Sequence, residues 1–175
     1  MAISAFIVDV PAAEPRVADL RARFDATAAL GVPAHVTVLV PFMDPDKITP
    51  AVLAEAQRAL DTICAFDFSL DRVGRFPETA YLAPEPAAPF VEMTMALWRR
   101  FPEFPPYGGE HAGVIAHLTA AHGSAANAEA AAALLEERLR AQGPVQARCA
   151  SVTLIENSSG VWKRMQVFPL RDAGR

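Results

Sequence analysis

The sequence predicts a mixed fold of strands and helices, built as two similar lobes that face each other across a cleft. Two observations support this prediction. The pattern His-x-Thr occurs twice inside short apolar runs, at residues 35–37 and 117–119. The expected elements also follow the order β-α-β-α-β and then β-α-β-α-β-β. Each element of the first series recurs about 74 to 79 residues later in the second, and the motif histidine recurs 82 residues later. We therefore place a first repeat at about residues 3–76 and a second at about 79–170, within one domain of residues 1–175.

The first repeat contains two helices between three strands. Apolar residues at helical spacing predict the first helix, which Gly31 and Pro33 end, and Thr49 with Pro50 marks the start of the second. Strict alternation of apolar and polar residues predicts that the third strand is half-buried. The strands and helices are expected, in chain order, at residues 5–10, 14–28, 35–42, 50–63 and 66–75.

The second repeat has the same order and one extra strand. Ser124 is a typical N-cap for its long Ala-rich helix, and Gly143 and Pro144 end that helix. Asn157 to Gly160 predicts a hairpin between the last two strands. The elements are expected at residues 79–83, 90–101, 115–120, 125–142, 145–155 and 161–170. A loop rich in Pro and Gly at residues 102–109 directly precedes the second His-x-Thr strand, and loops of this kind are often functional.

The composition is that of a globular protein. Hydrophobic residues make up 52% of the chain and charged residues 21%, and the net charge of −4 creates no general attraction for nucleic acid. The two cysteines, Cys64 and Cys149, are far apart and are expected to be buried free thiols. Neither a signal peptide nor an apolar run of membrane-spanning length is visible. We therefore expect a cytoplasmic monomer that binds no membrane.

The repeated motif places polar groups on one face of an apolar strand. Residues i and i+2 of a strand share a face, so His35 and Thr37 should project together, with Leu39 continuing the row. The alternating valines between and after them, Val36, Val38 and Val40, should face the core. Chance alone gives about 0.3 matches to His-x-Ser/Thr in a chain of this composition, so two copies are informative. If the two strands face each other, two imidazoles and two hydroxyls line one cleft.

Four segments resemble one known family. They are PAHVTVLVPF at 33–42, VGRFPETAYLAP at 73–84, PPYGGEHAGVIAHLTAA at 105–121 and VWKRMQVFPL at 161–170. The chain resembles the 2H phosphoesterase superfamily, and within it the bacterial proteins called 2′-5′ RNA ligase or cyclic phosphodiesterase-like. Family members often have Pro directly before the second motif histidine, where this chain has Ala116. The resemblance implies a bilobal α+β fold with two mainly antiparallel sheets around a central cleft.

The resemblance also implies chemistry on 2′,3′-cyclic phosphates or 2′-5′ phosphodiester linkages of RNA ends or nucleotides, without a metal or other cofactor. The residue types suit this chemistry. One of His35 and His117 would act as general base and the other as general acid in an in-line displacement at phosphorus, and either assignment remains open. Thr37 and Thr119 would bind the non-bridging phosphate oxygens. The partner is then a nucleotide or RNA end that carries a cyclic phosphate.

Other residues are candidates for substrate binding. Phe42 and Tyr81 could stack on a base, although core packing also explains them. Arg75 and Lys163, with Arg164, could clamp a phosphate, and solvated strand ends are an equal alternative. The remaining histidines, His111 in the loop and His122 on the expected opposite strand face, are interpreted as surface residues. A zinc site is not expected, because the histidine and cysteine spacings match no zinc motif.

Two other functions remain open. The same fold could bind a nucleotide or RNA end without turning it over, and the loop at residues 102–109 could contact another protein. Both intact His-x-Thr pairs favour the enzyme.

Overall fold

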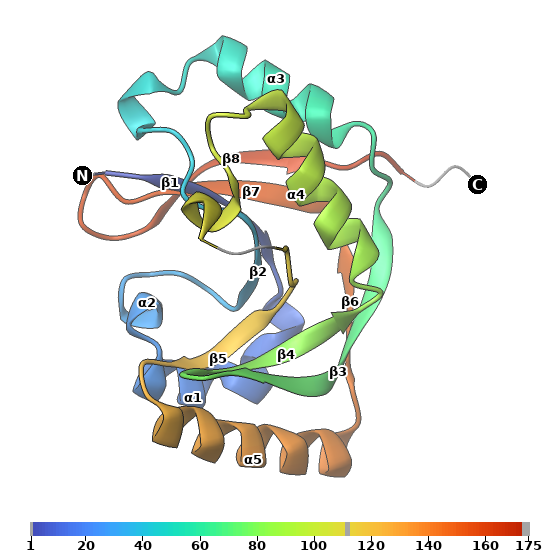
Figure 1. Cartoon of the computed structure of the whole chain (residues 1–175). Coiled ribbons are helices and arrows are strands. Elements are labelled where there is room, and N and C mark those ends of the chain that lie inside the picture. Colours follow the sequence, from blue (N-terminus) through green and yellow to red (C-terminus); the bar gives the residue numbers. More distant parts are fainter. Residues whose placement is uncertain (1, 111–112, 173–175) are drawn as a thin grey trace.

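Residues 2–110 and 113–172 are described by a computed structural model of the chain. Their strands form one eight-stranded sheet in the order β6-β3-β4-β5-β2-β1-β7-β8, in which all neighbouring strands are antiparallel (Figure 1). This confirms the mixed fold with antiparallel strands. The strands are β1 Ser4–Asp9, β2 His35–Leu39, β3 Phe66–Phe76, β4 Thr79–Glu85, β5 Leu118–His122, β6 Val145–Cys149, β7 Ser151–Glu156 and β8 Lys163–Pro169.

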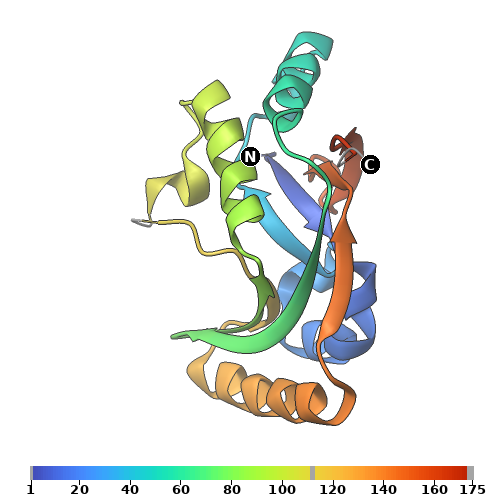
Figure 2. The ribbon, with the colours of Figure 1, turned by 90° about the vertical axis from the view of Figure 1, so that its right-hand side faces the viewer.

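The helices gather in two groups, one for each half of the sheet. Helices α1 and α5 pack on β3, β4 and β5, whereas α4 packs on β2, and α3 packs on α4 and β8. Figure 2 shows β3 curving from the side of α3 and α4 down to α5. None of the helices in the described ranges is long and apolar enough to cross a membrane. Their bounds are α1 Glu14–Phe24, α2 Ala26–Ala29, α3 Pro50–Leu60, α4 Ala88–Arg100 and α5 Ala125–Gln142, with 3₁₀ turns at Pro11–Ala13, Pro45–Lys47 and Pro106–Gly109.

The strand order is symmetric about the junction between β2 and β5. These strands meet at one residue pair, Val36 with Leu118, and each is flanked by longer ladders within its own half. One half contains β2, β1, β7 and β8, and the other contains β5, β4, β3 and β6. The expected two sheets are therefore one continuous sheet, because this pair joins the halves by hydrogen bonding.

The halves of the sheet do not follow the order of the chain. Strand β3, the last of the expected first repeat, pairs with β4 of the second, and β7 of the second pairs with β1 of the first. The single strand expected at residues 145–155 is in fact two strands. It is interrupted at Ala150, so that β6 joins β3 and β7 joins β1. Each half thus takes strands from both of the expected repeats.

Two further element boundaries differ from the expected ones. The helix expected at residues 14–28 breaks at Asp25, whose backbone is extended and whose side chain caps α2 by accepting from the backbone N–H of Thr27. The second His-x-Thr strand begins later than expected, at Leu118, so His117 lies just before it. The hairpin between β7 and β8 is confirmed.

A buried ion pair holds the segment that leads into β2. The Arg21 Nε donates to an Asp25 carboxylate oxygen at 3.0 Å, and both side chains are almost completely buried. Arg21 also donates to the carbonyl of Val32 at 3.0 Å, while Asp25 accepts from the hydroxyl of Thr27 at 2.7 Å. Because Val32 lies three residues before His35, this network fixes how the chain enters the first motif.

Replacing Arg21 with Met should lower the free energy of unfolding by about 3–5 kcal/mol, because it leaves the Asp25 carboxylate buried without its counter-ion. Urea unfolding followed by circular dichroism measures the loss. The matched control is Arg148→Met, which breaks the solvent-exposed pair of Arg148 with Asp67 and should change stability little. Equal losses in both variants would contradict the role given to Arg21.

Candidate functional site

The pairing of β2 with β5 brings the two His-x-Thr motifs to one face of the sheet. Val36 and Leu118 are opposite each other, and both are 0% exposed in the core. The residues on either side of them are half-buried and project to the other face. If this register is continued by one residue, His35 lies beside Thr119 and Thr37 beside His117. The expected convergence of the two motifs is therefore found in the backbone.

A β-bulge follows the threonine of each motif. Ile7 pairs with Thr37 but Phe6 pairs with Leu39, and in the other half Tyr81 pairs with Thr119 but Ala80 with Ala121. Each bulge inserts one residue and reverses the alternation of faces beyond it. Leu39 is consequently in the main core, which corrects the expectation that it continues the polar row. In β2 the bulge is supported by α4, because the Thr94 hydroxyl donates to the carbonyl of Val38 at 2.6 Å.

Both histidines are held by the same local hydrogen bond. The Nδ1 of His35 lies 2.8 Å from the carbonyl oxygen of Pro33, and the Nδ1 of His117 lies 2.7 Å from that of Ile115. A carbonyl oxygen only accepts, so Nδ1 must carry the proton in each ring. In the neutral form, Nε2 is then the nitrogen that can take up a proton. The two rings are thus oriented alike for proton transfer through Nε2.

Burial lowers the pKa of His35 below the ordinary value of 6.5. The residue is half-buried, and loss of solvation is the main cause of the shift. The carbonyl of Pro33 opposes the shift, the positive charge of Arg21 adds to it, and the carboxylates of Asp25 and Asp9 oppose it. The folded protein therefore favours the neutral imidazole at this position.

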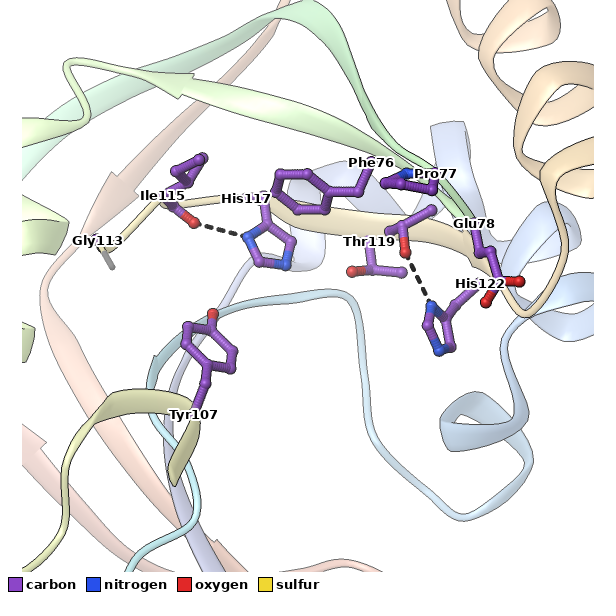
Figure 3. Close-up of a pocket in the computed structure, with 10 residues that line it drawn as sticks. Phe76, Pro77, Glu78, Tyr107, Gly113, Ile115, His117, Thr119 and His122 are labelled. Carbon is purple, nitrogen blue, oxygen red and sulfur yellow. Dashed lines mark hydrogen bonds between the residues drawn. The ribbon is translucent and has the colours of Figure 1, made fainter. Parts of the chain in front are cut away.

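A pocket of about 770 Å³ opens beside the second motif (Figure 3). It lies over β4, β5 and the hairpin between β3 and β4. His35 and Thr37 are on the adjacent strand and are not among the residues that line it. The lining residues are Phe76, Pro77, Glu78, Thr79, Tyr107, Gly113, Ile115, His117, Thr119 and His122.

Aromatic rings surround the imidazole of His117. The ring centroids of Phe76 and Tyr81 are each 5.3 Å from that of His117, and the ring of Tyr107 is nearly parallel to it at 6.4 Å. Gly74 makes room for this arrangement, because a Cβ there would approach the Tyr81 ring to 2.3 Å. The rings restrict the imidazole to the orientation that its bond to Ile115 sets.

Tyr107 reaches the pocket from the loop before the second motif. Its backbone N–H donates to the carbonyl of Val40 at 2.6 Å, which ties the loop to the end of β2. Its φ of 52° is left-handed, a conformation that is uncommon for residues other than glycine and that occurs often at functional sites. Burial raises the pKa of its phenol above 10.0. The loop predicted to be functional thus contributes a specific residue to the site.

The two aromatic residues expected to stack on a base, Phe42 and Tyr81, are both buried in the protein. Phe42 is 3% exposed and packs edge-on against Phe6, Phe101 and Phe104 in the core, so it cannot stack on a base. Tyr81 is 9% exposed and supports His117 instead of offering an open face. These two positions correct the stacking expectation, and in both cases the reason is burial by residues distant in sequence.

The expected phosphate clamp is not assembled either. Arg75 is exposed and lies between Gly74 and Phe76 in β3, so its side chain projects away from the pocket. Lys163 is exposed at the start of the edge strand β8. Arg164 is closer to the motifs, because it pairs at 3.2 Å with Asp9, which lies opposite His35 in the sheet.

Several residues that line the pocket were not among the expected site residues, namely Phe76, Pro77, Glu78, Thr79 and His122. His122 was expected on the opposite face, and the bulge after Thr119 returns it to the pocket side. No signal in a single sequence marks a bulge, so the sequence alone placed His122 at the surface and outside the site. His111 lies outside the described residues. Within the described part of the chain, no three His, Cys, Asp or Glu residues form a group that could hold a metal ion.

The stability of the protein should depend on His35 at mildly acidic pH. Below pH 6.5 the unfolded chain takes up a proton on this histidine, but the folded protein does not until its lower pKa is reached. Stability should therefore fall as the pH drops below 6.5 and be fully present above it. Urea unfolding at pH 5.5 and 7.5 tests this, and His35→Gln should reduce the difference between the two. An unchanged difference in that variant would contradict the lowered pKa.

The same architecture occurs in solved structures. LigT of E. coli, in complex with 3′-AMP, superposes with a TM-score of 0.61 at 14% identity, over 96% of this chain and 97% of that one. TT0787 of Thermus thermophilus has a TM-score of 0.58 at 16% identity, over 98% and 100%. A protein described as a phosphoesterase has 0.60 at 13%, over 97% and 98%. At these identities the likeness concerns the fold.

Comparison with sequences gives the family. Among curated proteins, none matches this chain. A family model does match, that of the 2′-5′ RNA ligase superfamily, and it covers residues 8–160, which include both His-x-Thr motifs and the pocket. The chain therefore belongs to the 2′-5′ RNA ligase superfamily.

Proposed function

We propose that the protein is a metal-independent phosphoesterase that acts on 2′,3′-cyclic phosphates or 2′-5′ phosphodiester linkages of RNA ends or nucleotides. The observation that carries this proposal is the register of β2 and β5, which turns His35, Thr37, His117 and Thr119 to one face. Two imidazoles and two hydroxyls around one phosphate are sufficient for acid-base displacement at phosphorus.

The reaction on a cyclic phosphate requires one proton to be removed and one to be added. A water molecule attacks phosphorus and gives a proton to one Nε2, while the bond to a ribose oxygen breaks and that oxygen receives a proton from the other Nε2. The hydroxyls of Thr37 and Thr119 donate to the non-bridging oxygens, where negative charge develops. With an RNA hydroxyl in place of water as the nucleophile, the same displacement opens the cyclic phosphate and forms a phosphodiester linkage.

We assign His35 as the base and His117 as the acid of the hydrolysis. The lowered pKa of His35 keeps its Nε2 without a proton near neutral pH, which is the state that a base needs. His117 is at the pocket with its Nε2 directed inward (Figure 3), where it can reach a leaving oxygen. The pocket volume and the complex of LigT with 3′-AMP support a nucleotide as the substrate.

Turnover of 2′,3′-cyclic nucleotides should survive EDTA, because the proposed charge stabilisation comes from hydroxyls and imidazoles. Chromatographic analysis of the product shows whether a 2′- or 3′-monophosphate forms. Loss of turnover in EDTA that a divalent ion restores would show that the reaction uses a metal.

Replacing either histidine with Ala should reduce turnover about 10²–10⁴-fold, because each one handles a proton in the transition state. The turnover of the double variant should be little lower than that of the less active single variant, since the pair acts as a unit. Thr37→Ala and Thr119→Ala should each reduce turnover less than either histidine change does. The loss of one hydrogen-bond donor to the developing charge sets the upper range of this reduction, about 10²–10³-fold. Steady-state kinetics measures these losses.

The control for the threonine variants is Thr62→Ala, which removes an exposed hydroxyl outside the pocket and should leave kcat unchanged. A His117→Ala protein with near-normal turnover would refute the two-histidine mechanism. Binding of nucleotides without any turnover in the wild type would instead favour the binding module on the same fold.

A further inference from the structure

One end of the pocket carries a third histidine. Strand alternation alone would place His122, five residues after His117, on the core side of the sheet. The bulge between Thr119 and Ala121 returns it to the pocket wall, where it is exposed. Figure 3 shows His122 beyond Thr119, on the far side from His117. A group bound there would belong to the part of a substrate beyond its reacting phosphate.

His122 is tethered differently from the two motif histidines. Its Nδ1 is 2.8 Å from the hydroxyl oxygen of Thr79, which is 8% exposed and lies opposite it in the sheet. A hydroxyl can donate as well as accept, in contrast to the carbonyls that hold His35 and His117. When Thr79 donates to Nδ1, the neutral ring keeps its proton on Nε2. His122 can then donate a hydrogen bond to a ligand.

Two further residues that line the pocket add a ring and an acceptor. Half-buried Phe76 lines the pocket with its ring centroid 5.3 Å from that of His117, and Glu78 contributes an exposed carboxylate from the tip of the hairpin. The hairpin is anchored, because the Glu78 carbonyl accepts from the backbone N–H of Gly123 at 3.0 Å. Among the described lining residues none is Lys or Arg. This charge pattern disfavours the binding of a second phosphate and suits an uncharged ligand group that carries polar atoms along one edge.

We propose that Phe76, Glu78 and His122 form a nucleobase subsite that selects guanine. This inference rests on the proposed function and names the base of its substrate. The carboxylate of Glu78 would accept from the N1–H and the N2 amino group of guanine, and His122 Nε2–H would donate to O6. The ring of Phe76 would lie against the base, as aromatic side chains do with unpaired bases. Of the common bases, guanine presents two adjacent N–H donors beside an acceptor.

Guanosine and inosine 2′,3′-cyclic phosphates test the subsite, since inosine lacks the N2 amino group. The wild type should have a kcat/KM about fivefold higher for guanosine, the lower end of the effect of a bidentate contact because Glu78 is exposed. Glu78→Gln should abolish this preference, because an amide offers one acceptor and a donor that confronts the amino group. The matched control is Glu92→Gln, an exposed carboxylate on α4 outside the pocket, which should retain it.

His122→Ala should raise KM for both substrates with little change in kcat, because both carry O6 and the contact is remote from the reacting phosphate. Thr79→Val keeps the shape of the side chain but removes the hydroxyl, so it should raise KM in the same direction and by less. A fall in kcat alone in His122→Ala would overturn the binding role and point to catalysis.

The failures of the two proposals are distinguishable. Turnover with equal kcat/KM for guanosine and inosine in the wild type overturns the subsite and leaves the phosphoesterase proposal intact. If no cyclic phosphate is turned over, the phosphoesterase proposal fails, and calorimetric binding of guanosine and inosine 2′-monophosphates decides the subsite. Tighter guanosine binding that Glu78→Gln removes supports it, and equal affinities overturn it.

Discussion

The site depends on one contact, the pairing of Val36 in β2 with Leu118 in β5. This pair joins the two halves of the sheet, and both side chains are completely buried among the helices. Because neighbouring residues of a strand project to opposite faces, burying the pair turns the polar residues on either side of it to the other face. The pairing that buries these two apolar side chains is therefore also what turns the two histidines to the opposite face of the sheet.

The two halves repeat their backbone more closely than their side chains. Both have a bulge directly after the motif threonine, and both tether Nδ1 of the histidine to the carbonyl two residues earlier. The surroundings differ, since the His117 ring is enclosed by aromatic rings, whereas the sheet face beside His35 carries an aliphatic cluster that includes Ile7 and Ile155. Different surroundings for two similar groups are what separate roles in acid-base chemistry require.

Much of the fold was accessible from the sequence, because local physics determines the elements. Apolar patterning located every long helix and all the strands, except that β6 and β7 were expected as one strand, and caps such as Thr49 and Ser124 marked helix starts that the structure confirms. The repeated His-x-Thr pattern also indicated which four polar side chains share a face. These features depend on residues within a few positions of each other, so they can be recognised without the fold.

The sequence by itself determined the elements, the polar motifs and the family resemblance, whereas the tertiary structure decided which other residues surround the site. Phe42 and Arg75 looked suitable for substrate but lie in the core and on the opposite face. Tyr107 and His122 reach the pocket through a loop tied to β2 and through a bulge. The physical reason is that strand register and bulges are set by packing between residues far apart in the chain, and one inserted residue moves every side chain beyond it to the other face.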